Sequence, residues 1–83
     1  MDNKRFIIIG RSTCPFCNMA QDYLSALGQE LIFLDYATKP TILEDYKEFH
    51  GQSTVPIILS NDLQSGLTHK VGGYTDLLEF FGD

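Results

Sequence analysis

Cys14 and Cys17 are the residues of this chain best suited to chemistry, and the sequence contains no other cysteine. Only Pro15 and Phe16 separate them. A disulfide between them would close almost no loop, so it would restrict the unfolded chain little and add little stability. Small secreted domains that depend on disulfides carry more cysteines at wider spacing. The pair therefore indicates a redox or a metal-binding role.

The elements around Cys14 favour the redox role. Residues 6–9 form an apolar, β-branched run typical of a strand buried on both faces. Apolar residues then recur at steps of three and four from Phe16 to Leu27, which predicts a helix that Gly28 ends. At the start of such a helix, unpaired N–H groups and the helix dipole stabilise an anion. We therefore expect the pKa of the Cys14 thiol to be lowered.

Cys14 is the predicted nucleophile, and Arg11 lies three residues upstream, where it would add positive potential. Cys17 follows one helical turn later and could attack a mixed disulfide formed at Cys14. Half of a zinc site is the alternative, because four ligands are needed and His50, His69 and scattered carboxylates remain. Neither histidine has ligand spacing to another, so redox chemistry is favoured and no metal site is expected.

The chain predicts a single domain over residues 1–83 with an α/β fold. Residues 31–34 form a second apolar run, so strand, helix and strand make a βαβ unit with parallel strands. Residues 41–44 (Thr-Ile-Leu-Glu) fit a capping box, which predicts a second helix from Thr41 to about His50.

The C-terminal third predicts two more strands and a helix. The strand over residues 55–59 contains Pro56, which cannot donate to a ladder and is expected at the strand's beginning. After a polar loop over residues 60–68, a short strand is expected near residues 69–71. The last helix would be capped by Thr75 or Asp76. The predicted order is β-α-β-α-β-β-α.

Composition excludes several classes of partner. The formal net charge is −5 and the pI about 4.7, with no cluster of Lys and Arg, which argues against a nucleic-acid partner. The run over residues 6–9 is far shorter than a signal sequence or the ~20 apolar residues of a membrane span. The chain is expected to be a cytoplasmic monomer with no membrane or nucleic-acid partner.

Three segments resemble the signature segments of glutaredoxins, and they occur in the family's order. They are residues 10–17 (Gly-Arg-Ser-Thr-Cys-Pro-Phe-Cys), residues 54–56 (Thr-Val-Pro) and residues 72–77 (Gly-Gly-Tyr-Thr-Asp-Leu). The resemblance implies a thioredoxin-like (glutaredoxin) fold, with a four-stranded mixed sheet flanked by three helices. It also implies a glutathione-disulfide oxidoreductase that reduces protein disulfides and glutathione mixed disulfides through the Cys14/Cys17 dithiol.

The implied co-substrate is glutathione, and no tightly bound cofactor is expected. The expected partners are disulfide-bearing or glutathionylated proteins, among which ribonucleotide reductase is common for the family. The Val55 backbone, before a cis Pro56, would pair with the extended tripeptide. The start of the last helix would bind one carboxylate, and Asp76 would pair with the ammonium. The implied glutathione-binding residues are Arg11, Phe16, Thr54, Val55, Pro56, Gly73, Tyr74, Thr75 and Asp76.

The sequence departs from the family's pattern at four places. The connection from Pro56 to Gly72 is several residues longer than usual, through residues 61–66, which bears on the choice of partner. Phe16 replaces the usual tyrosine, which keeps the ring but loses the hydroxyl. Arg11 replaces a common lysine and keeps the charge. Residues 42–44 lack the Gln or Arg that members often place there, so the glycine carboxylate of glutathione would depend on Arg11, with Gln52 or Lys47.

Other functions remain as alternatives. A redoxin coupled to thioredoxin reductase shares the fold and the C-x-x-C motif, but it lacks the glycine pair and acidic helix start found over residues 72–76. In glutaredoxins that carry an iron–sulfur cluster, a proline after the first cysteine is generally unfavourable, and Pro15 stands there. A pure interaction module would make no use of a thiolate at a helix start.

Overall fold

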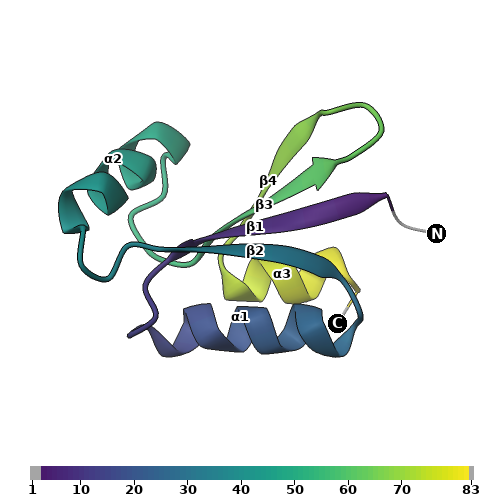
Figure 1. The fold of residues 1–83 in the computed structure, drawn as a ribbon, viewed down its shortest axis with the longest axis horizontal. Helices are drawn as coiled ribbons and strands as arrows, with labels where there is room; N and C mark the ends of the chain where they lie inside the picture. The colour runs from purple at the N-terminus through teal and green to yellow at the C-terminus, as the bar shows by residue number, and fades with distance from the viewer. Residues whose placement is uncertain (1–2, 83) are drawn as a thin grey trace.

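The computed structural model describes residues 3–82 and shows the predicted order of strands and helices (Figure 1). Residues 1, 2 and 83 of the predicted domain lie outside the described part. The elements are β1 (Lys4–Gly10), α1 (Pro15–Ala26), β2 (Glu30–Asp35), α2 (Pro40–His50), β3 (Ile57–Asp62), β4 (Thr68–Gly72) and α3 (Tyr74–Phe80).

The four strands form one mixed sheet in the order β2-β1-β3-β4. β1 runs parallel to β2, with Ile8 opposite Phe33, as the predicted βαβ unit requires. β1 runs antiparallel to β3, and β3 pairs antiparallel with β4 in a hairpin. The sheet thus brings the end of β1, which leads to Cys14, beside the start of β3, which follows Pro56.

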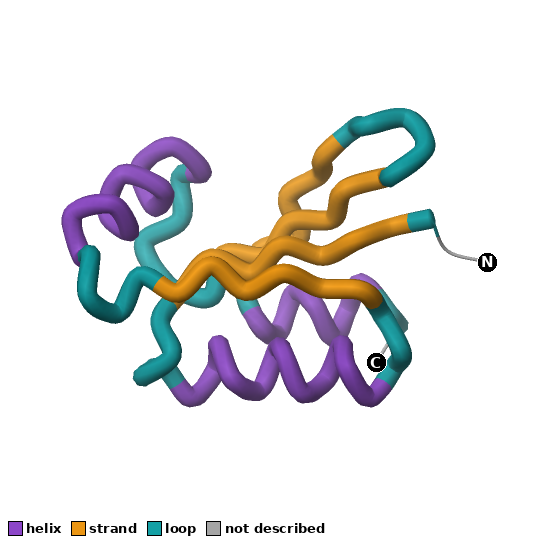
Figure 2. The backbone as a smooth tube through the Cα atoms, in the orientation of Figure 1, coloured by secondary structure: helices purple, strands orange, loops and turns teal. Residues whose placement is uncertain are grey.

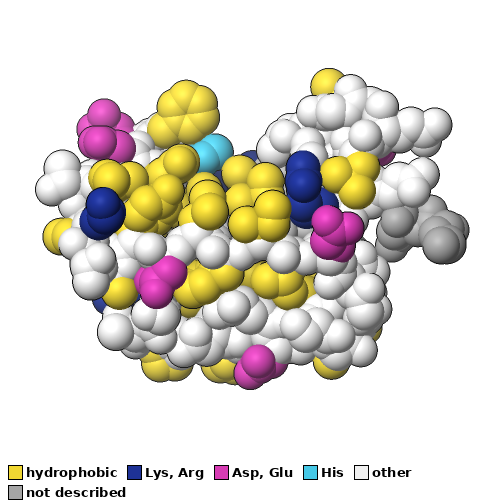
Figure 3. Space-filling view, in the orientation of Figure 1, with side chains coloured by type: hydrophobic (Ala, Val, Ile, Leu, Met, Phe, Trp, Pro, Cys, Tyr) yellow, Lys and Arg dark blue, Asp and Glu magenta, His cyan; other side chains and the backbone are white. Residues whose placement is uncertain are grey.

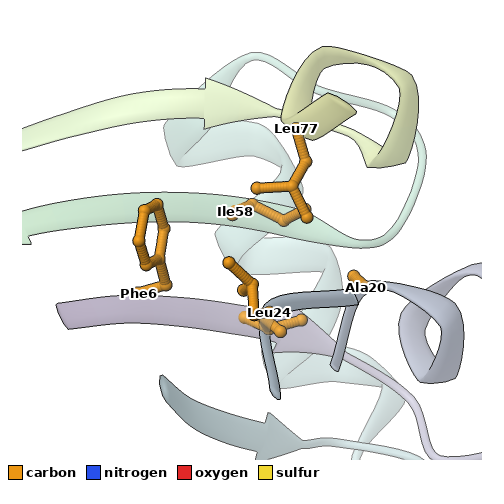
Figure 4. Packing of buried hydrophobic residues seen from close by; sticks show 6 residues of the cluster. Phe6, Ala20, Leu24, Ile58 and Leu77 are labelled. Atoms are coloured by element: carbon orange, nitrogen blue, oxygen red, sulfur yellow. The ribbon is translucent and has the colours of Figure 1, made fainter. Parts of the chain in front are cut away.

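Helices cover both faces of this sheet, and Figures 1 and 2 show α1 and α3 on one face and α2 against the other. On the first face the buried side chains of the strands pack against both helices, and Figure 4 shows Phe6, Ala20, Leu24, Ile58 and Leu77 meeting there. On the second face Ile9, Ile57 and Leu59 pack against Leu43 of α2. The run over residues 6–9 therefore supplies both layers, as a strand buried on two faces should.

α2 covers only one end of the second face. Apolar side chains gather on the surface between α2 and the β3–β4 hairpin (Figure 3). Phe49 of α2 is 83% exposed, and Ile32 of β2 is 40% exposed.

In the described residues, no helix is long and apolar enough to cross a membrane.

The predicted apolar stripe of α1 is only partly buried. Cys17, Ala20 and Leu24 are fully buried, whereas Phe16 and Leu27 remain exposed. The stripe that faces the sheet therefore runs through Cys17, and Phe16 lies beside it.

The capping box predicted at Thr41 is wrong. α2 begins one residue earlier, with Pro40 in the first helical turn and Lys39 at the N-cap, and no side chain caps it. The fixed φ of proline suits the first helical position, so Thr41 already lies inside the helix. The predicted end is confirmed, because Gly51 adopts a left-handed conformation with φ 63°.

Of the two predicted caps of the last helix, Thr75 is wrong, and Asp76 caps the helix from inside its first turn rather than as the N-cap residue. Gly73 is the N-cap of α3, so Thr75 lies within the first turn. Asp76 takes part in the cap from the third helical position, where its carboxylate accepts a hydrogen bond from the Gly73 N–H at 2.8 Å.

The hairpin strands differ in length from the prediction. β3 begins at Ile57 rather than Val55, because Pro56 has no N–H to donate. β3 and β4 extend to Asp62 and Thr68, so the connecting turn is shorter than predicted.

Candidate active site

Cys14 is the N-cap of α1, with an extended backbone at φ −96° and ψ 118°. Pro15 follows in the first helical turn, and neither a side-chain cap nor an acidic residue occupies this end of the helix. The Cys14 Sγ atom lies 4.0 Å from the Val55 carbonyl oxygen. The first N–H groups of α1 are therefore free to stabilise a thiolate that faces Val55.

The surroundings of the Cys14 thiol lower its pKa, as the sequence predicts. Burial raises the pKa, but the N–H and thiol of Cys17, the Phe16 N–H and the charge of Arg11 all favour the thiolate and together outweigh burial. The nucleophile is thus stabilised by donors on its own helix, with Arg11 as an added charge.

Cys17 has the opposite character. It is fully buried, and burial, the hydrogen bond that its thiol makes with Cys14, and the negative charge of Cys14 raise the pKa of Cys17 to about 12. A Cβ atom at Gly10 would collide with the Cys17 sulfur, so Gly10 permits this close approach. Both cysteines are free thiols in the structure.

A cleft of about 760 Å³ lies between the segment that contains Val55 and the β4–α3 junction. All of the predicted glutathione-binding residues line it except Arg11. The lining residues are Phe16, Gln52, Thr54, Val55, Pro56, Lys70, Val71, Gly72, Gly73, Tyr74, Thr75 and Asp76.

The walls of the cleft offer a free backbone edge and an aromatic surface. The Val55–Pro56 peptide bond is cis, as predicted, and in the described chain the Val55 N–H has no hydrogen-bond partner. The rings of Phe16 and Tyr74 lie with their centroids 5.9 Å apart, and the Phe16 side chain is 55% exposed. An extended ligand could therefore pair with Val55 while it packs against these rings.

The polar residues predicted to complete the site take different places. Gln52 lines the cleft, where its amide donates to the Thr54 and Pro56 carbonyls at 2.9 and 2.8 Å. Lys47 forms an ion pair with Glu44 at 2.9 Å and does not line the cleft.

Sequence reasoning did not identify Lys70, whose ammonium donates to the His50 carbonyl at 2.8 Å and which lines the cleft. Lys70 reaches the cleft only because β3 pairs with β4. A single lysine near a short predicted strand does not indicate that pairing. In the described residues, no group of three or more His, Cys, Asp or Glu could hold a metal ion.

A protein-family model described as Glutaredoxin matches residues 6–63, which is more than half of the chain. The chain belongs to the glutaredoxin family. Its thioredoxin-like fold and its two cysteines, separated by two residues, are those of this family. A glutaredoxin is a thiol–disulfide oxidoreductase.

Solved structures of glutaredoxins share this fold. Reduced Escherichia coli glutaredoxin is 28% identical, with a TM-score of 0.69 over 92% of this chain and 91% of that chain. Wheat glutaredoxin is 22% identical, with a TM-score of 0.74 over 94% of this chain and 71% of that chain. A buckwheat glutaredoxin–glutathione complex is 16% identical, with a TM-score of 0.75 over 96% and 70%. A search of curated protein sequences found no match.

Proposed function

We propose that this glutaredoxin is a glutathione-dependent oxidoreductase that reduces glutathione mixed disulfides and protein disulfides. The observation that carries the proposal is the position of Cys14, which is an N-cap with a lowered pKa opposite the free backbone edge of Val55. Nucleophilic attack on a disulfide requires a thiolate, and this position stabilises one.

On a glutathione mixed disulfide, the Cys14 thiolate attacks the glutathione sulfur. A bond forms between these two sulfurs as the original disulfide breaks, and the released protein thiolate takes a proton from water. The thiolate of a second glutathione then attacks the glutathione sulfur on Cys14, which yields glutathione disulfide and restores the Cys14 thiolate. Cys17 is not needed in this cycle.

On a protein disulfide, Cys14 becomes joined to the substrate and Cys17 must resolve the intermediate. In the reduced protein the negative charge of Cys14 helps to raise the pKa of Cys17. That charge disappears once Cys14 forms a covalent bond, so Cys17 loses its proton more easily when it is needed. Attack by Cys17 on Cys14 releases the substrate thiolate and leaves a Cys14–Cys17 disulfide, which two glutathiones reduce.

The cleft supports glutathione as the co-substrate. Val55 would pair with the backbone of the tripeptide, and Phe16 and Tyr74 would pack against it. Asp76 would pair with the γ-glutamyl ammonium, because a carboxylate that accepts the Gly73 N–H retains capacity for further bonds. Thr54, Pro56, Gly73 and Thr75 would complete the contacts. The second carboxylate would depend on Arg11, because both N–H groups of the Gln52 amide already donate to the Thr54 and Pro56 carbonyls.

The proposed setting is the cytoplasm, where two cysteines so close in sequence remain available for exchange rather than for stability. The proposed partners are disulfide-bearing or glutathionylated proteins, and ribonucleotide reductase is a candidate among them. We propose that the single domain acts as a monomer.

A coupled assay tests the function. A glutathionylated peptide is offered with glutathione, glutathione reductase and NADPH, and in parallel the oxidised protein is offered to thioredoxin reductase. We expect rapid turnover with glutathione and little reduction by thioredoxin reductase. Reduction by thioredoxin reductase alone would contradict the proposal and favour the thioredoxin-reductase-coupled alternative.

A further inference from the structure

The turn over residues 11–14, which connects β1 to α1, is fixed by hydrogen bonds with two side chains outside it, Asp35 and Asn18. Within the turn, the Cys14 N–H donates to the Arg11 carbonyl at 3.0 Å. The Ser12 N–H donates to the Asp35 Oδ1 atom at 2.9 Å, and the Asn18 side-chain amide donates to the Ser12 carbonyl at 3.0 Å. Ser12 thus has both of its backbone polar groups fixed, and we call Asp35, Ser12 and Asn18 the Ser12 anchor.

Asp35 ties the turn to the sheet. It is the last residue of β2 and lies opposite Gly10, the last residue of β1. Its Oδ1 atom also accepts a hydrogen bond from the Ala37 N–H at 3.0 Å, and the Tyr36 N–H donates to the Gly10 carbonyl at 2.8 Å. The bonds from the Ser12 N–H, the Ser12 side chain and the Ala37 N–H lower the pKa of the Asp35 carboxyl. Asp35 is therefore an ionised acceptor at neutral pH.

Asn18 ties the same turn to α1. Its backbone N–H donates to the Cys14 carbonyl at 3.2 Å, as expected in the first turn of the helix. Its side chain reaches back to the Ser12 carbonyl. The turn is therefore fixed both to the sheet and to the helix whose N–H groups must meet the Cys14 sulfur.

We propose that Asp35 and Asn18 are positioning residues for the reaction, which hold the Cys14 sulfur against the first N–H groups of α1. The inference rests on the proposed thiolate chemistry of Cys14. A thiolate gains from a helix N-terminus only while it stays within the first turn. Without the anchor, the turn could move and carry the sulfur away from those donors.

The direction in which the pKa of Cys14 changes in Asp35→Ala shows whether Asp35 acts by positioning the turn or by its charge. A negative charge near a thiol disfavours the thiolate, so loss of the Asp35 charge alone would lower the pKa of Cys14. If Asp35 acts by position, Asp35→Ala raises the pKa of Cys14 instead. Asp35→Asn keeps an oxygen that can accept the Ser12 N–H, so this conservative variant should retain most of the wild-type reactivity.

The chain offers a matched control in the β3–β4 turn. The Asp62 Oδ1 atom accepts hydrogen bonds from the Gln64 and Ser65 N–H groups at 2.9 and 3.1 Å. It therefore fixes a turn with the same kind of bonds as Asp35, but at the hairpin. Asp62→Ala should reduce stability without changing Cys14.

The experiment titrates Cys14 by the pH dependence of iodoacetamide alkylation, in the wild type and in Asp35→Ala, Asp35→Asn, Asn18→Ala and Asp62→Ala. Thermal unfolding is measured alongside. At a pH below the wild-type pKa of Cys14, we expect Asp35→Ala and Asn18→Ala to react about tenfold more slowly, since less thiolate is present. At high pH, where Cys14 is fully ionised, the variants should react at least as fast as the wild type, because a thiolate of higher pKa is the stronger nucleophile.

An unchanged or lowered pKa of Cys14 in Asp35→Ala and Asn18→Ala would overturn the inference. If Asp35→Ala does not fold, Asn18→Ala decides by itself, because it removes the anchor from the other side. Alkylation needs no glutathione, so this result is independent of whether the proposed glutathione activity is found.

Discussion

The first turns of α1 and α3 both line the cleft beside Val55, but their third helical positions carry different side chains. In α3 that position is Asp76, and its carboxylate accepts the N–H of the N-cap residue, Gly73. In α1 it is Cys17, which is buried and whose pKa is raised to about 12. Cys17 is therefore neutral at physiological pH and brings no competing charge. At the N-terminus of α3 a carboxylate of the helix itself accepts a backbone N–H. At the N-terminus of α1 no carboxylate does so, and the N–H groups remain available to the Cys14 thiolate.

This contrast separates a structural cap from a reactive one. A helix N-terminus stabilises whichever anion lies there, whether a carboxylate or a thiolate. Asp76 gives α3 a fixed start beside Gly73. The first turn of α1 contains no acidic residue, so no carboxylate competes with the Cys14 sulfur for its N–H groups.

The largest effect is expected from removal of the Cys14 thiolate at the N-terminus of α1. Cys14→Ser should abolish both reduction of glutathione mixed disulfides and reduction of protein disulfides, because a serine hydroxyl does not ionise under these conditions. Turnover of both substrate types in the coupled assay checks this, with circular dichroism as the control for folding. Remaining activity through Cys17 would refute the assignment of roles.

Cys17→Ser should separate the two substrate types. Deglutathionylation should continue, because a second glutathione can release Cys14, whereas reduction of a protein disulfide should fall strongly. The serine hydroxyl can still donate to the Cys14 sulfur, so the nucleophile keeps that donor. Equal loss of both activities would show that Cys17 is needed for more than resolution.

Asp76→Ala should have a smaller effect, on binding. If Asp76 pairs with the ligand ammonium, the KM for a glutathionylated substrate should rise about fivefold, or ~1 kcal/mol, with little change in kcat. Loss of the bond to Gly73 should also lower stability by ~1 kcal/mol. Asp62→Ala, in the hairpin turn, is the control for a stability loss without a change in KM. A normal KM in Asp76→Ala would make Asp76 a cap only.

Much of this arrangement could be predicted from local sequence. The order of elements followed from apolar periodicity, and Cys14 was placed at a helix start by Pro15 and the strand before it. The capping box at Thr41 failed because Pro40 competes for the first helical position. The role of Asp76 as a cap was recognisable, but its N-cap partner was not, since Gly73 offers no side chain.

The parts that could not be predicted depend on contacts between distant segments. Asp35 meets Ser12 only because β1 and β2 end side by side, with Gly10 opposite Asp35. Lys70 reaches the cleft only through the β3–β4 pairing and its bond to the His50 carbonyl. Neither contact leaves a motif in the sequence, because aspartate at a strand end and lysine on an edge strand are ordinary in many proteins.

The central claim is that the open N-terminus of α1 makes Cys14, and not Cys17, the reactive thiolate. Alkylation of the reduced protein across a pH series, with the modified cysteine identified by mass spectrometry, tests it most directly. We expect modification of Cys14 alone at neutral pH, with a rate that falls only when the pH drops below its lowered pKa. Cys17 should stay unmodified until the pH approaches its pKa of about 12. Preferential labelling of Cys17 at neutral pH, or a Cys14 that titrates like an ordinary thiol, would contradict the account.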